Sequence, residues 1–334
     1  MPQSSGTALD NQKITPDGAD RTDMERIRNL LILRGGALGD FLLTLPAVAA
    51  LHRQWPSAAI DLVTDSRFAD LAIGSGWVRK VHSLDAALMA QLYVPDRERD
   101  PALAESLRGY DAALCYLEDP DRTIAHTLDE AGIRQRVILS PRVVHGHAID
   151  HFLSALRYFG IDGKGGDAFV LNLPSIRTEI AARLTDQGPF AVIHPGSGSV
   201  RKNWPMARFI RLADRIQREM AIRPLFLLGE AEAALEMVLK QVAPTALFLT
   251  KLALMEVATV LKLARFYVGN DSGITHLSAS LGSPTWALFG PTDPVQWAPR
   301  GLRVHVVRSY ERGLHPMEDL AEDTVWQALK VGDG

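Results

Sequence analysis

The 334-residue chain has little cysteine, no long apolar run and almost no net charge. Its only cysteine, Cys115, excludes an intramolecular disulfide and a cysteine-rich metal site, and it fits a reducing compartment. No apolar segment approaches the roughly 20 residues that span a bilayer, and the N-terminus has no apolar signal core. The formal net charge of -3 provides no global basic field for nucleic acid. We therefore expect a cytoplasmic protein with no nucleic-acid partner.

Two common nucleotide-binding motifs are missing from the first glycine-rich turn, which follows the predicted buried strand Ile27–Leu33. The dinucleotide motif G-x-G-x-x-G fails because Arg34 stands two positions before Gly36. The P-loop fails because Asp40 and Phe41 stand where Lys and Ser or Thr are required. What remains is an acid, Asp40, at the start of a predicted helix. It either interacts with the helix dipole or serves as a carboxylate that accepts a proton, and the pattern leaves both open.

The segment Tyr267–Pro294 carries the most informative pattern of the chain. It predicts a strand, a polar turn, the helix Ile274–Leu281, the strand Thr285–Phe289 and a second polar turn. Ligands of open parallel sheets lie beyond the carboxyl ends of strands, and a helix N-terminus suits a diphosphate. Four residues are expected to meet there: Asp271, Ser272, Gly273 and His276. For Ser272 alone, helix capping is the better interpretation.

A second polar loop, His194–Pro205, follows the predicted strand Phe190–Ile193. Its glycines and serines let backbone and hydroxyl donors approach an anion, and Lys202 supplies a point charge. The pair Trp204-Pro205 fixes the entry to the next helix, which argues against a flexible surface loop. We interpret this segment as a phosphate loop.

The chain length predicts two domains, because one core rarely grows beyond about 250–300 residues. Each half shows alternating strands and helices with its own glycine-rich turn, so the active site is expected in a cleft between them. Residues 1–24 are interpreted as a disordered or loosely attached arm, and residues 25–172 and 173–316 as the two domains. Residues 317–334 predict a C-terminal helix, for which packing back on the first domain is one arrangement.

Three groups of residues together resemble glycosyltransferase family 9, whose type members are the ADP-heptose:lipopolysaccharide heptosyltransferases. The groups are Arg34-x4-Gly39-Asp40-x5-Pro46; His194-Pro195-Gly196-Ser197 with Lys202-x-Trp204-Pro205; and Asn270-Asp271-Ser272-Gly273-x2-His276 with Gly290-Pro291-Thr292-Asp293-Pro294. The resemblance runs from about Leu30 to Gly301. It implies an α/β protein of GT-B architecture, with two Rossmann-like domains whose parallel sheets face a central cleft. The first would bind the acceptor and the second the nucleotide sugar.

The resemblance also implies residue roles. Asp40 matches the general base that deprotonates the acceptor hydroxyl. The residues implied to bind the donor are Ser197, Lys202, Glu230, Asp271, Ser272, Gly273 and His276, with Gly39, Gly196, Thr292 and Asp293 in support. Among the basic residues of the first half, Arg67 and Arg122 are candidates for contact with an anionic acceptor.

The implied reaction is inverting transfer of a sugar without a metal ion or cofactor, with ADP-heptose as donor co-substrate. The implied acceptor is a lipopolysaccharide core or another cell-envelope glycan. Gly35-Gly36-Ala37 replaces hydroxyl residues common in the family, which leaves the identities of both sugars open. Two alternatives are a nucleotide-sugar epimerase of GT-B fold and a non-catalytic nucleotide-sugar-binding protein. We expect a monomer with at most peripheral contact at the cytoplasmic face of the inner membrane.

Overall fold

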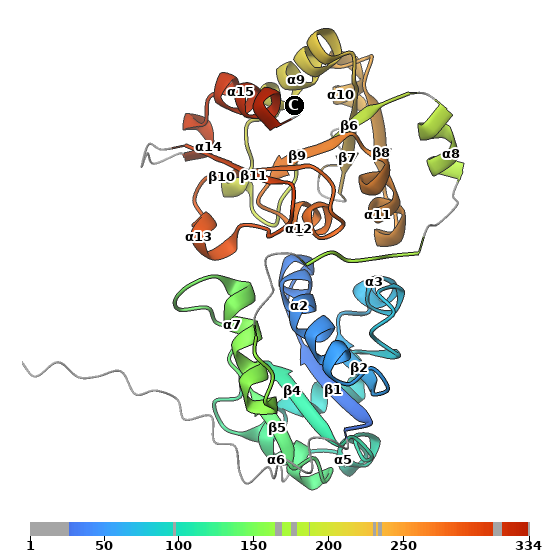
Figure 1. Cartoon of the computed structure of the whole chain (residues 1–334), viewed down its shortest axis with the longest axis vertical. Coiled ribbons are helices and arrows are strands. Elements are labelled where there is room, and N and C mark those ends of the chain that lie inside the picture. Colours follow the sequence, from blue (N-terminus) through green and yellow to red (C-terminus); the bar gives the residue numbers. More distant parts are fainter. Residues whose placement is uncertain are drawn as a thin grey trace, which may run out of the picture.

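The computed structural model describes residues 27–95, 98–163, 169–174, 179–186, 188–229, 232, 236–309 and 316–332. The chain forms two parallel sheets, one after the other, and Figure 1 shows them stacked with helices around each. The arm expected over residues 1–24 lies outside the described residues. In the part of the chain that is described, no helix is both long and apolar enough to cross a membrane.

The first sheet has five strands in the order β3-β2-β1-β4-β5. All four strand pairs are parallel, and β4 is buried along its whole length, which is why it reads as a continuous apolar run. The strands are β1 Asn29–Arg34, β2 Ala59–Thr64, β3 Lys80–Ser83, β4 Ala112–Tyr116 and β5 Gln135–Ile138. The helices and short turns are α2 Leu38–Gln54, η1 Ser66–Phe68, α3 Ala69–Gly74, α4 Ala87–Ala90, η2 Gln91–Tyr93, α5 Pro101–Ser106, α6 Thr123–Glu130, α7 Ala148–Ser154 and η3 Ala155–Phe159.

The second sheet has six parallel strands in the order β11-β10-β9-β6-β7-β8. The strands are β6 Phe190–His194, β7 Arg223–Leu228, β8 Leu247–Thr250, β9 Phe266–Asn270, β10 Thr285–Phe289 and β11 Val304–Arg308. The helices and short turns are α8 Glu179–Asp186, η5 Val200–Lys202, α9 Met206–Arg215, η6 Ile216–Met220, α10 Glu236–Val242, α11 Leu254–Leu263, α12 Gly273–Ser280, α13 Pro294–Trp297, α14 Pro316–Asp319 and α15 Glu322–Gly332.

Strand order places the candidate turns where ligands bind in such sheets. The order of the first sheet reverses between β1 and β4, and Asp40 follows β1. The order of the second reverses between β6 and β9, which pair side by side with His194 opposite Gly269. The loop after β6 and the turn after β9 therefore lie together at the carboxyl edge, at a topological switch point.

The two sheets meet through the N-terminal ends of α2 and α12, and one apolar cluster spans the boundary, with Leu42 on one side and Leu277 on the other. A Cβ atom on Gly273 would lie 2.8 Å from Leu38 Cβ, so the absence of a side chain permits this approach. Residues 164–168, between the two sheets in the sequence, lie outside the described residues; after them, Leu171 N donates to Ser280 O over 2.6 Å.

The C-terminal helix packs on the second sheet and not on the first domain. Val325, Trp326 and Leu329 of α15 belong to the apolar cluster of the second sheet. The indole of Trp286 on β10 donates to Ala328 O over 3.0 Å, and the guanidinium carbon of Arg215 on α9 lies 4.6 Å from the Trp326 ring centroid. The arrangement in which this helix returns to the first domain is therefore wrong, because its apolar face is already covered by β10 and α9.

Candidate active site at the domain boundary

Asp40 is held by its own turn at the start of α2. Gly36 adopts a φ of 97°, which reverses the chain after β1, and a Cβ there would lie 2.7 Å from Asp40 Oδ2. Asp40 Oδ2 accepts the Ala37 N–H over 3.0 Å, and Oδ1 lies 3.2 Å from Arg34 Nη2. The Asp40 side chain nevertheless remains 39% exposed. It therefore keeps room for a contact with a bound molecule.

Asp271 is the meeting point of three loops of the second domain. It follows β9, and its side chain is only 8% exposed. Its Oδ2 accepts from Lys202 Nζ over 2.8 Å and from Thr292 Oγ1 over 2.8 Å. The turns after β9 and β10 and the loop after β6 thus converge on one carboxylate. Lys202 remains 31% exposed, so this charge is accessible beside the carboxylate.

His276 lies on α12 beside the same carboxylate, with Nε2 3.9 Å from Asp271 Oδ1. Burial lowers the pKa of His276 to about 4, His147 and Lys202 act in the same direction, and Asp271 and Asp40 oppose them. The imidazole is therefore neutral at pH 7 and can donate one hydrogen bond. Asp40 of the first domain is among the charges that act on this imidazole, so the two side chains lie near each other across the domain boundary.

The two domains present helix N-termini to each other at this site. A Cβ on Gly39 would lie 3.5 Å from His276 Cδ2, so the first turns of α2 and α12 are in near contact. The backbone N–H groups and the helix dipoles at the N-termini of α2 and α12 favour an anion bound between the two helices, and Lys202 adds a positive charge. The arrangement suits a diphosphate held from the second domain and a carboxylate offered from the first.

The loop after β6 is held by a buried amide, Asn270, which the sequence analysis names only as a motif position. Asn270 is fully buried; its Oδ1 accepts from Trp204 N over 3.0 Å and its Nδ2 donates to Pro195 O over 2.7 Å. Ser197 Oγ lies 2.7 Å from Ser199 O and 2.6 Å from Asn203 Oδ1, so this hydroxyl shapes the loop from within. The loop is consequently ordered by specific contacts.

The remaining candidate donor-binding residues lie at helix caps, in the loop after β6 or outside the described residues. Ser272 caps α12, with its hydroxyl accepting from Thr275 N over 3.4 Å, as the capping interpretation holds. Asp293 is an exposed cap of α13. Glu230 lies outside the described residues. A Cβ on Gly196 would meet the carboxylate of Glu232 at 2.6 Å, so Gly196 leaves room for that side chain.

The two acceptor candidates lie on the same edge of the first sheet as Asp40. Arg67 follows β2 and forms an ion pair with Asp65 over 2.6 Å, with 77% of its side chain exposed. Arg122 follows β4 in a left-handed conformation with a φ of 59° and is exposed. The role of both residues in binding an acceptor stays a prediction.

The contacts of two further residues, Arg34 and His147, were not predicted from the sequence. Arg34 appears in the sequence analysis only as a motif position, yet it contacts Asp40 directly. His147, at the start of α7, crosses the boundary: its Nδ1 accepts from Ile149 N, and its Nε2 therefore donates to Ala298 O over 2.8 Å. Only folding brings residues 147 and 298 together, so no local pattern could indicate this contact.

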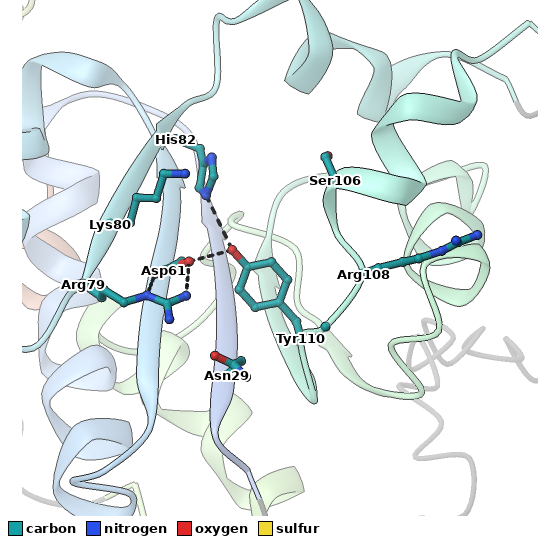
Figure 2. Close-up of a pocket in the computed structure, with 9 residues that line it drawn as sticks. Asn29, Asp61, Arg79, Lys80, His82, Ser106, Arg108 and Tyr110 are labelled. Carbon is teal, nitrogen blue, oxygen red and sulfur yellow. Dashed lines mark hydrogen bonds and ion pairs between the residues drawn. The ribbon is translucent and has the colours of Figure 1, made fainter.

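A polar cavity of about 570 Å³ lies elsewhere, at the amino ends of the first sheet (Figure 2). Asp61 is paired within this cavity: Arg79 binds it through two bonds of 2.9 and 2.7 Å, and the Tyr110 hydroxyl donates to it over 2.7 Å. It is separate from the Asp40 site. Within the described ranges, no cluster of three or more His, Cys, Asp or Glu has the arrangement of a metal site.

Comparison with known proteins identifies the family. The family model described as glycosyltransferase family 9 (heptosyltransferase) matches residues 146–323, more than half of the chain. The chain belongs to glycosyltransferase family 9. Lipopolysaccharide heptosyltransferase 1 of Escherichia coli K12 is 25% identical over 312 residues, covering 79% of this chain and 88% of that protein. The Pseudomonas aeruginosa protein of the same name is 27% identical over 290 residues, covering 79% of each. The family membership makes this chain a glycosyltransferase.

Solved structures confirm the GT-B fold. A family 9 glycosyltransferase from Veillonella parvula superposes with a TM-score of 0.74 at 19% identity, covering 92% of this chain and 97% of that one. The E. coli heptosyltransferase WaaC with ADP gives a TM-score of 0.67 at 22% identity, covering 91% and 99%. The fold and the family inferred from the three motif groups are thus confirmed.

Proposed function

We propose that this chain transfers a heptose from ADP-heptose to a lipopolysaccharide core or another cell-envelope glycan, with inversion at the anomeric carbon and without a metal ion. The observation that carries the proposal is the pairing of one accessible carboxylate, Asp40, with the cluster of Lys202, Asp271 and His276 on the other domain. The donor is supported by the names of the relatives, and by a structural relative described as WaaC with ADP-2-deoxy-2-fluoro heptose, at a TM-score of 0.65 and 21% identity.

The proposed reaction is a single displacement. Asp40 accepts the proton of an acceptor hydroxyl, whose oxygen bonds to the anomeric carbon as the bond from that carbon to the phosphate oxygen breaks. The electron pair of the broken bond leaves on ADP. Lys202 and the N-terminus of α12 stabilise this developing charge, and attack from the opposite face inverts the configuration. Neutral His276 and the Asp271 carboxylate hydrogen-bond the donor.

The acceptor is proposed to enter from the first domain, at the edge that carries Asp40, Arg67 and Arg122. Sequence similarity to lipopolysaccharide heptosyltransferases over 79% of the chain supports an amphiphilic acceptor presented at the cytoplasmic face of the inner membrane. We propose that a monomer acts there by peripheral contact.

The test is transfer by the purified chain with ADP-heptose, ADP-glucose, UDP-glucose or GDP-mannose, each with and without heptose-free lipopolysaccharide. The expected result is ADP release and a heptose mass increment on the acceptor, only with both substrates present. The configuration of the new bond, read by NMR, checks inversion. Formation of an epimer or free sugar without acceptor would instead indicate the epimerase alternative.

The Asp40→Asn variant tests the base. It keeps the shape of the side chain but cannot accept the proton, so we expect transfer to fall by about 10³-fold while the dissociation constant of ADP-heptose stays within about twofold. Transfer at the wild-type rate would refute the assignment. Donor binding is measured by calorimetry on the same preparation.

A further inference from the structure

Arg34 is an unusual residue at the end of β1, because its side chain is only 3% exposed. Burial lowers the pKa of its guanidinium, although the carboxylate of Asp40 and the neighbouring Tyr116 favour the charged form. A buried cation requires compensation by hydrogen bonds and a counter-ion. The question is therefore what this charge does at the boundary of the site.

The contacts of Arg34 lead to one residue. Its Nη2 lies 3.2 Å from Asp40 Oδ1, and its Nε donates to Asp40 O over 3.3 Å. Its Nη1 lies 3.5 Å from Tyr116 O, the carbonyl that ends β4. Arg34 thus holds both the carboxylate and the backbone of the predicted base.

An aromatic ring also contacts the guanidinium. The Arg34 Cζ lies 4.6 Å from the centroid of Phe152 on α7, a cation–π geometry. Phe152 is fixed in turn, because the Tyr116 hydroxyl donates to Phe152 O over 2.7 Å and the two rings meet edge to face at 5.2 Å. The guanidinium plane is therefore held between β4 and α7 and has little freedom to turn.

Stability alone does not account for this arrangement. The hydrogen bonds of Arg34 are all 3.2 Å or longer, so they compensate only weakly for the desolvation of its charge. Replacement of both members of a buried ion pair by apolar side chains is often neutral or stabilising, so a buried charge is weak evidence of a role in folding alone. The retained charge is consequently better explained by what it does to Asp40.

We propose that Arg34 is a positioning residue that fixes the Asp40 carboxylate in the orientation needed for proton transfer. Arg34 Nη2 holds Oδ1 and the Ala37 N–H holds Oδ2, so rotation of the carboxylate is blocked from both sides. The exposed part of the carboxylate faces the incoming hydroxyl. This inference rests on the proposed function, in which Asp40 accepts that proton.

A double-mutant cycle tests the coupling. Arg34→Met removes the charge and keeps the apolar stem, and we expect kcat to fall about 10²-fold, as for a base misplaced by about 1 Å, with the ADP-heptose dissociation constant within about twofold. In the Asp40→Asn background, the same substitution should change the residual rate less than about threefold, because the group it positions no longer accepts a proton. Arg34→Lys should recover part of kcat, since it keeps the charge but loses the planar contact with Phe152.

The outcomes separate this inference from the proposed function. If the wild-type chain transfers no heptose, the proposed function fails. If Asp40→Asn is inactive but Arg34→Met is as active as wild type, only the inference is overturned. Equal losses from Arg34→Met in both backgrounds also overturn it, because a general effect on folding would act irrespective of Asp40. Thermal unfolding and donor binding of each variant show whether the fold is retained.

Discussion

Replacing Gly273 with alanine adds one methyl group where α12 meets α2. The new Cβ would lie 2.8 Å from Leu38 Cβ, 3.0 Å from Leu38 Cγ and 3.1 Å from Gly39 N. Carbon atoms in good contact are about 3.5–4.0 Å apart, so the two helices must separate by about 1 Å. The backbone itself accepts the change, because Gly273 has no left-handed φ and alanine favours a helix by about 1 kcal/mol.

The separation should affect catalysis more than folding. Asp40 and His276 lie on the two helices that would move apart, so the proposed base would be misplaced relative to the donor. A displacement of about 1 Å can lower the rate about 10²-fold. We expect Gly273→Ala to lower kcat by about that factor, with the dissociation constant of ADP-heptose and the melting temperature close to wild type.

The assay is steady-state transfer with calorimetric donor binding on the same samples. A compensating variant provides the control: Leu38→Gly removes both clashing side-chain atoms, and in the Gly273→Ala background it should recover part of kcat. A Gly273→Ala enzyme with full transfer would refute the steric reasoning. Loss of donor binding without loss of kcat would show that the helix N-terminus, and not the domain spacing, is what the methyl group disturbs.

Three further outcomes are expected. Folding leaves His276 with a pKa of about 4 against an ordinary 6.5, so the unfolded chain takes up the proton first as pH falls. The free energy of unfolding should therefore decrease as the pH is lowered from 6.5 to 4. Urea denaturation of the His276→Gln variant should show a smaller decrease over this range, and a decrease equal to that of the wild-type chain would contradict this reasoning. Burial raises the pKa of Cys115 to about 12, so iodoacetamide at pH 8 should modify this thiol only after denaturation, as read by mass spectrometry. EDTA should leave the rate of transfer unchanged; a loss restored by a divalent cation would contradict metal-independent transfer.

Much of the fold follows from local pattern. The strand Thr285–Phe289 is found with the predicted bounds, because a strand buried on both faces reads as a continuous apolar run between turn residues. The predicted helix Ile274–Leu281 is α12, shifted by one residue at each end. The helix predicted to follow Trp204-Pro205 begins at Met206, but its last turn, from Ile216 to Met220, is π-helical. Hydrophobic periodicity does not resolve this difference.

The placement of the candidate residues at the carboxyl edges of the sheets could also be predicted, but not the contacts among them. The polar turns do follow parallel strands, as the sequence pattern predicts. The bond from Lys202 to Asp271, however, joins residues 69 positions apart, and it depends on β6 lying beside β9. Strand order is decided by how the whole sheet packs, and no spacing between two motifs encodes it.

Gly273 shows why the remaining features could not be predicted from the sequence. In the sequence it lies in a turn, and relief of a tight turn is the natural interpretation of a glycine there. The structure gives a different reason: the backbone conformation suits any residue, and the glycine is required because Leu38 of the other domain occupies the space of its side chain. Arg34 is comparable, since a basic residue at a strand end reads as solvated surface until Phe152 and Tyr116 are seen to bury it. Both residues lie at contacts between segments that are distant in the sequence: Gly273 between α12 and α2, and Arg34 between β1, β4 and α7.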